Sequence, residues 1–217
     1  MNNDEPFVIA IDGTAASGKG ILAKNLSAIL KIDYLCTGNL YRAAAKKLMA
    51  LTKNDPIDNF SELAYKCAQE VTIEDSKDPS LASDEIAKCA SRLASNLKVR
   101  EFLTDLQKVF AKNVGGLIIE GRDIGTVVFP NAQVKIFLTA SDASRASRRK
   151  LEFEKNSINI DYEKILHDIK ARDYGDMNRA IAPLKVAEDA IMLDTTDMSA
   201  EEVTKFIVSK IAKRKLI

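Results

Sequence analysis

The chain has 217 residues, of which 46% are hydrophobic and 29% charged, enough to bury one main core with room for an insertion. Its 32 lysines and arginines nearly balance its 31 aspartates and glutamates, so net charge predicts no nucleic-acid partner and no attraction to anionic membranes. The polar start, Met1–Glu5, is unlike a signal peptide, and no apolar run approaches the roughly 18 residues of a membrane span. We therefore expect a cytoplasmic protein.

A glycine-rich segment follows the first apolar run, Phe7–Ile11. Gly13–Gly20 reads GTAASGKG, and a helical pattern continues from Ile21 to Leu30. Between a strand and a helix, such a loop directs backbone N–H groups and a lysine, here Lys19, at phosphate oxygens. The residues predicted to bind the phosphates of a nucleoside triphosphate are those of the loop and the first residue after it, namely Gly13, Thr14, Ala15, Ala16, Ser17, Gly18, Lys19, Gly20 and Ile21.

The rest of the chain alternates expected strands and helices. Further strands are expected over 33–36, 71–73, 117–120, 134–138 and 190–193, and helices over 40–51, 61–70, 83–97 and 99–113. Lys53–Pro56 breaks the second helix, and 75–80 reads as a polar turn. The alternation predicts an α/β fold with a parallel sheet covered on both faces, which binds its ligand at the carboxyl ends of the strands.

The cysteines and the single histidine disfavour several classes of enzyme. Cys36, Cys67 and Cys89 are odd in number and lack C-x-x-C spacing, so reduced structural thiols are predicted. His167 falls off the apolar stripe of a helical pattern over 162–169, which places it at the surface. A Ser-His-Asp hydrolase and a His/Cys zinc enzyme are therefore disfavoured. Catalysis would have to use carboxylates, cationic groups and Mg²⁺.

Charged residues mark two further places. Glu120 ends an apolar strand, which is how phosphate-loop enzymes place a carboxylate near the metal, directly or through water. Arg145, Arg148 and Arg149 have helical spacing, and 172–179 reads RDYGDMNR. On charge alone, a solvated helix with ion pairs is the simpler interpretation. Beside a phosphate loop, guanidinium groups instead suit a transferred phosphoryl group, and closure of such a segment would exclude water.

Four motifs together resemble bacterial cytidylate kinase. They are the GKG of the loop, Thr37–Arg42 (TGNLYR), Glu120–Pro130 (EGRDIGTVVFP) and Arg179–Leu184 (RAIAPL). The resemblance spans about residues 7–206, and EGRDIGTVVFP is far more specific than the loop. It implies a single domain with the P-loop nucleoside-monophosphate kinase fold. The core would comprise 1–36, 98–144 and 184–217, the acceptor-binding (NMP-binding) subdomain about 37–97, and the helical lid about 145–183.

The resemblance also implies an activity. The γ-phosphate of ATP would pass to CMP or dCMP, giving CDP or dCDP and ADP, with Mg²⁺, in a kinase of pyrimidine metabolism that we expect to be a monomer. Two alternatives are weighed against it. A kinase for another small acceptor (UMP, AMP, shikimate or dephospho-coenzyme A) would share the loop and lid but not the other motifs. A non-catalytic nucleotide-binding regulator should show a large basic face or an additional domain.

Residue roles follow from the same resemblance. The implied catalytic residues are Lys19, Arg122, Arg172 and Arg179, with Arg145 and Arg148 as further ATP contacts and Glu120 as the metal residue. The implied CMP-binding residues are Thr37, Tyr41, Arg42, Ser91, Arg100, Arg122, Asp123, Arg172, Asp176 and Arg179. Of these, Ser91, Arg100 and Asp123 would face the cytosine. A carboxylate can accept from its N4 amine, and an arginine can donate to N3 and O2.

The chain also departs from the family pattern. Glu120 replaces the usual aspartate, and Ile21 replaces a usual threonine and would simply pack its helix. Ala82, Gly175 and Met177 stand where basic residues are common. The stretch 71–80 looks shorter than the insert of the long bacterial form, so an abbreviated sheet is expected there. We expect the same reaction despite these changes.

Overall fold

The computed structural model describes residues 6–52, 59–155 and 158–213. The chain forms two compact units. The helical unit comprises Leu35–Leu117, and the core unit comprises Phe7–Tyr34 together with Ile118–Ile217. No helix in the described ranges is long and apolar enough to span a membrane. The break expected at Lys53–Pro56 lies outside the described residues.

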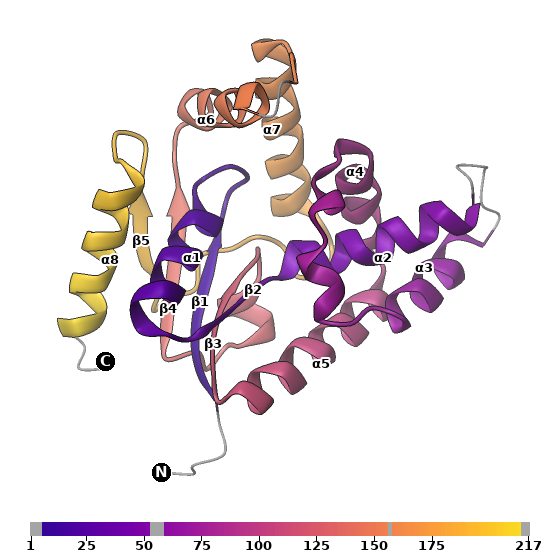
Figure 1. Ribbon diagram of the computed structural model, residues 1–217, viewed down its shortest axis with the longest axis horizontal. Coiled ribbons are helices and arrows are strands. Elements are labelled where there is room, and N and C mark those ends of the chain that lie inside the picture. The colour runs from indigo at the N-terminus through magenta and orange to yellow at the C-terminus, as the bar shows by residue number, and fades with distance from the viewer. Residues whose placement is uncertain (1–5, 53–58, 156–157, 214–217) are drawn as a thin grey trace. The chain divides into compact units, whose positions relative to one another are not determined.

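Five strands form one sheet in the order β2-β3-β1-β4-β5 (Figure 1). Their bounds are β1 Phe7–Gly13, β2 Asp33–Cys36, β3 Gly116–Glu120, β4 Val134–Thr139 and β5 Ile191–Asp194. β4 pairs in parallel with both β1 and β5, with Ile9 opposite Val134 and Ile136 opposite Ile191. The central strands read as apolar runs because both of their faces are buried. The predicted α/β class with a parallel sheet is confirmed.

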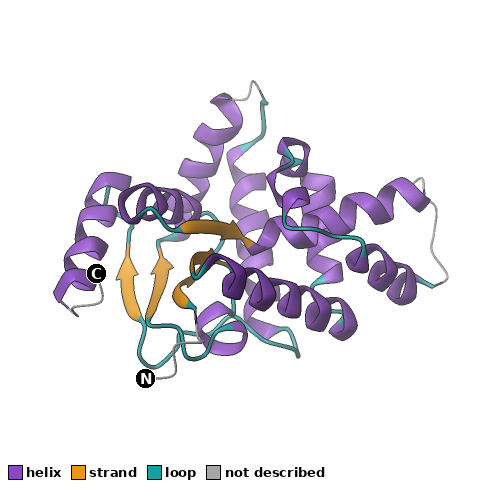
Figure 2. Ribbon diagram, turned by 60° about the horizontal axis from the view of Figure 1, so that its bottom comes forward, coloured by secondary structure: helices purple, strands orange, loops and turns teal. Residues whose placement is uncertain are grey.

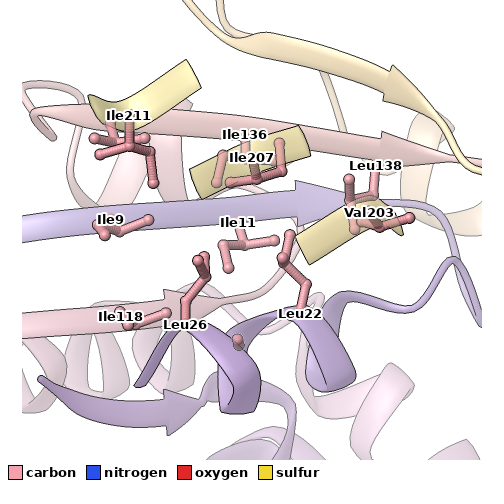
Figure 3. Close-up of a cluster of buried hydrophobic side chains, with 12 residues drawn as sticks. Ile9, Ile11, Leu22, Leu26, Ile118, Ile136, Leu138, Val203, Ile207 and Ile211 are labelled. Carbon is pink, nitrogen blue, oxygen red and sulfur yellow. The ribbon is translucent and has the colours of Figure 1, made fainter. Parts of the chain in front are cut away.

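Two helices of the core unit, α1 (Lys19–Leu30) and α8 (Ala200–Lys213), help to build its main hydrophobic cluster. Figure 3 shows Leu22 and Leu26 of α1 and Ile207 of α8 gathered against Ile9 and Ile11 of β1. Burying a side chain of this size contributes about 1.5–3 kcal/mol. The loop between β1 and α1 is therefore held at both ends by elements anchored in the core.

The core unit also contains a short π-helix, η3 (Ile124–Val128). Its helices α6 (Asp142–Lys155) and α7 (Tyr162–Asn178) pack against each other (Figure 1). Ala146, Ile165 and Ile169 are buried between them. The stripe predicted over 162–169 thus faces a neighbouring helix. The His167 side chain is 81% exposed, which confirms its predicted surface position.

The helical unit contains α2 (Thr37–Thr52), α3 (Phe60–Gln69), α4 (Asp84–Leu93) and α5 (Leu97–Val114). Two short 3-10 helices, η1 (Glu74–Lys77) and η2 (Pro79–Ala82), lie between α3 and α4. Figure 2 shows no strand in the described part of the chain between Cys36 and Gly116. Cys36, Cys67 and Cys89 form no disulfide within the described residues, in agreement with the predicted reduced thiols.

Three expectations in this unit were wrong. The segment 71–73 is no strand, so no abbreviated sheet exists there. Asp75 accepts from the Thr72 backbone N–H at 2.9 Å, a local contact that leads the chain into η1, and the expected polar turn over 75–80 is largely 3-10 helix. The helix expected over 83–97 ends at Leu93, because Asn96 caps α5 by accepting from the Val99 N–H at 3.3 Å.

Candidate active site

The phosphate loop begins where β1 meets its neighbour β4. Gly13 has a φ of +147°, and a Cβ at this position would lie 2.0 Å from the carbonyl oxygen of Leu138. Only glycine fits so close to another strand. The Thr14 N–H donates to the same oxygen at 3.3 Å, which fixes the start of the loop on β4.

Lys19 is the first residue of α1, and its side chain is buried under the loop. Its Nζ donates to the Thr14 carbonyl at 2.6 Å and to Ser17 Oγ at 3.4 Å. Burial above all, and the charge of Arg122 after it, lower the pKa of Lys19 to about 7, while the charge of Glu120 opposes the change. An arriving anion would offset this loss of solvation, so the site suits phosphate.

The EGRD segment after β3 and the end of α7 are joined by two ion pairs. Arg122 Nε donates to Asp176 Oδ2 at 2.6 Å, and Arg179 Nη2 donates to Asp123 Oδ1 at 3.1 Å. Burial alone would raise the pKa of Asp176, but the charge of Arg122 and other nearby arginines lowers it below its ordinary value. The core unit therefore brings together residues more than 50 positions apart, as the predicted catalytic cluster requires.

Arg172 is exposed on α7, and its charge reaches the same cluster. It contributes to the lowered pKa of both Lys19 and Asp176. The four predicted catalytic residues are thus linked by electrostatic interactions within the core unit, in part through Asp176. These residues are Lys19, Arg122, Arg172 and Arg179.

Asp12 was missed by the sequence analysis. It is buried near the end of β1, and its two carboxylate oxygens accept from the backbone N–H groups of Ile124 and Gly125 at 2.9 and 2.7 Å. Burial raises the pKa of Asp12 to about 6. The signal that singled out Glu120, an acid at the end of a buried strand, applied equally to Asp12. It anchors the turn that follows Arg122 and Asp123.

Asp173 was missed as well. Its carboxylate accepts from the Ala15 N–H at 2.9 Å and pairs with the guanidinium of Arg145. Arg145, only 3% exposed, also donates to the Ala15 carbonyl at 2.9 Å. The structure thus places Arg145 behind the phosphate loop as a support for its backbone. Its contact with ATP stays a prediction.

A hollow lies beside the loop, lined in part by Ser17, Gly18, Ile21, Arg148 and Thr195. Arg148 Nη1 donates to Thr195 Oγ1 at 3.0 Å. The expectation that Ile21 packs its helix was wrong, because its side chain is 55% exposed and borders this hollow. The buried face of α1 is formed instead by Lys19, Leu22, Ala23 and Leu26.

The helical unit holds the remaining predicted acceptor residues. Thr37 begins α2 and is buried, and Tyr41 follows one turn later. The buried guanidinium of Arg100 lies 5.9 Å from the centroid of the Tyr41 ring, within cation–π range, and donates to the Ala94 carbonyl at 3.3 Å. The structure therefore brings Tyr41 and Arg100 together.

Two other acceptor candidates of this unit donate hydrogen bonds to backbone carbonyls. Arg42 Nη1 donates to the Leu81 carbonyl at 3.2 Å, next to Ala82. Ser91 is exposed on α4 and donates to the Ala87 carbonyl at 3.2 Å. Their roles toward CMP stay predictions.

The residues available to a divalent cation are few. No group of three or more histidine, cysteine, aspartate or glutamate side chains in the described ranges could hold a metal ion. Glu120 is 8% exposed, and its charge acts on both Lys19 and Arg122. One carboxylate at a phosphate site fits Mg²⁺, which binds through one or two carboxylates with phosphate oxygens and water.

A family model described as cytidylate kinase matches residues 9–213. The chain belongs to the cytidylate kinase family. Family members similar to it include the cytidylate kinase of Methylocella silvestris, 46% identical over 199 residues, covering 92% of this chain and 91% of that protein. The cytidylate kinase of Rhizobium meliloti is 42% identical over 213 residues, covering 97% and 99%.

Solved structures agree with the fold expected for a cytidylate kinase family member. A protein from Thermus thermophilus superposes with a TM-score of 0.50 at 16% identity, covering 95% of this chain and 98% of that one. An uncharacterized protein from Eubacterium ventriosum has a TM-score of 0.50 at 15% identity, covering 96% and 99%. At such identities the likeness concerns the fold alone.

Proposed function

We propose that this protein transfers the γ-phosphate of ATP to CMP or dCMP, giving CDP or dCDP and ADP, with Mg²⁺. The observation that carries the proposal is the joining of the EGRD segment to the end of α7 by two ion pairs, next to the buried Lys19 of the phosphate loop. Membership of the cytidylate kinase family over residues 9–213 supports the choice of acceptor.

The chain's own residues perform the transfer by positioning and charge. The loop N–H groups and Lys19 bind the ATP phosphates, and Arg122, Arg172 and Arg179 neutralise charge on the transferred group. Mg²⁺, when bound beside Glu120, supplies further neutralisation of the phosphate oxygens. An oxygen of the acceptor phosphate attacks in line. No general base is needed, because the second pKa of a phosphate monoester is about 6.

The two ion pairs prepare the arginines for this task. Asp176 holds the guanidinium of Arg122, and Asp123 holds that of Arg179, so less side-chain entropy is lost when phosphate binds. Asp123 would then accept from the N4 amine of cytosine. Uracil has a carbonyl there, so it would leave Asp123 poorly paired and react less well.

An ADP-release assay tests the proposal with ATP and Mg²⁺ against CMP, dCMP, UMP, AMP, GMP and shikimate. We expect the highest kcat/KM with CMP or dCMP. Failure with both cytidine nucleotides, in a preparation shown by calorimetry to bind ATP, would overturn it. A clear preference for AMP or shikimate would assign the chain to another small-acceptor kinase.

A further inference from the structure

The N-terminal turn of α1 is crowded by a carboxylate from β3. A Cβ at Gly20 would lie 3.1 Å from Oε1 and 3.7 Å from Oε2 of Glu120. In the common phosphate loop this position is a serine or threonine whose hydroxyl helps to hold Mg²⁺. In this chain, a serine or threonine side chain at position 20 would lie against the Glu120 carboxylate.

Tyr34 holds that carboxylate in place. The Tyr34 hydroxyl, on β2, donates to Glu120 Oε1 at 2.5 Å, and both side chains belong to the core unit. A hydrogen bond to an ionised acceptor is stronger than one between two neutral groups. Because Glu120 is buried, the bond also restricts where its oxygens can lie.

The charge of Glu120 acts on the phosphate-binding cations. It raises the pKa of Lys19 and that of Arg122, opposing the effect of burial on both. The carboxylate therefore lies within electrostatic reach of the groups that would bind the ATP phosphates. A metal ion bound to those phosphates would meet the same charge.

We propose that the Glu120 carboxylate replaces the missing loop hydroxyl as the protein's contact to the divalent cation, and that Tyr34 is the residue that positions it. Gly20 is then a requirement of the site, because a serine there and Glu120 compete for one space. The inference rests on the proposed ATP and Mg²⁺ use, and it adds the pairing of Gly20 with Glu120 and the role of Tyr34.

The experiment measures ATP-analogue binding without any acceptor, so that its outcome is independent of CMP kinase activity. Calorimetry with a non-hydrolysable ATP analogue gives Kd with Mg²⁺ and with chelator, and their ratio is the metal-dependent gain in affinity. We expect Glu120→Ala and Glu120→Gln each to reduce this gain roughly tenfold or more. Tyr34→Phe should reduce it less, with the affinity measured in chelator unchanged.

A double-mutant cycle tests the competition for space. Gly20→Ser alone should lower the metal-dependent gain and the melting temperature, because the introduced hydroxymethyl group displaces Glu120. In the Glu120→Ala background the same substitution should lower neither, and its hydroxyl should restore part of the gain. Gly175→Ser is the matched control, since a Cβ there meets nothing within 4 Å. Tyr65→Phe, in the helical unit, controls for loss of a tyrosine hydroxyl.

Three results would overturn the inference. The first is a metal-dependent gain that is absent in the wild type or unchanged in both Glu120 variants. The second is an equal effect of Gly20→Ser with and without Glu120. The third, a Tyr34→Phe protein that melts earlier but keeps the full gain, would reduce Tyr34 to a structural role. Loss of CMP phosphorylation with an intact gain would instead count against the proposed function.

Discussion

Replacing Asp12 by asparagine should produce an unusual pH dependence of stability. Burial raises the pKa of Asp12 from 3.8 to about 6 in the folded protein. Between pH 3.8 and about pH 6, the Asp12 carboxyl is therefore mostly protonated in the folded state and mostly ionised in the unfolded state. The stability contributed by protonated Asp12 is present below that window and is lost as the pH rises through it. This is the reverse of the usual behaviour of an ion-paired aspartate.

The magnitude follows from the size of the change in pKa. Titration of Asp12 changes the free energy of unfolding of the wild type by about 3 kcal/mol in all, and by about 2 kcal/mol between about pH 4.5 and pH 7. Asp12→Asn removes this titration. Over that range the wild type should lose stability relative to the variant by this amount. Asparagine also leaves one of the two backbone N–H groups of Ile124 and Gly125 without its acceptor, which costs about 1–3 kcal/mol at every pH.

Urea unfolding of both proteins at several pH values, followed by circular dichroism, measures the difference in free energy of unfolding. Asp176→Asn is the matched control. The arginines around Asp176 outweigh burial and hold its pKa below 3.8, so its stabilising effect is lost only at more acidic pH. A pH-independent difference for Asp12→Asn, or a slope of opposite sign, would refute the reasoning. The variant should also lose roughly 10- to 100-fold in kcat as the turn after Asp123 shifts.

Three further substitutions test the site. Lys19→Ala should lower kcat by at least about 100-fold with an unchanged circular dichroism spectrum. Near-normal turnover would show that Lys19 does not take part in catalysis. Because burial lowers the Lys19 pKa to about 7, ATP binding at about pH 8 should take up a proton in the wild type and not in this variant, measured by calorimetry in two buffers. Asp123→Ala should lower kcat/KM with both acceptors, because it releases Arg179, and should lower it more for CMP than for UMP, whereas an equal loss with both acceptors would contradict base recognition. Asp173→Asn should lower the free energy of unfolding by about 2–4 kcal/mol, because the buried guanidinium of Arg145 loses the negative charge of Asp173. An unchanged urea midpoint would contradict a stabilising role for this ion pair.

The motif residues and the alternation of strands and helices determined the fold class and the phosphate loop from sequence alone. Both depend on local patterns: an apolar run over 7–11, glycines at fixed spacing and Lys19 at the start of a helix. The EGRDIGTVVFP and RAIAPL motifs identified the family in the same way. The chain's local patterns failed at 71–73, where a short run of strand-forming residues found no partner strand and side-chain contacts of Thr72 and Asp75 began a 3-10 helix instead.

Only the tertiary structure decided what supports the loop and which way its neighbours face. Asp12 accepts from backbone groups 112 and 113 residues away, and Asp173 accepts from Ala15 at a separation of 158. The exposure of Ile21 depends on how α1 is rotated against the sheet, and the crowding at Gly20 depends on a carboxylate from another strand. A local pattern contains the type of each residue but not its distant partner. Hydrogen bonds and contacts between distant parts of the chain therefore could not be predicted from the sequence.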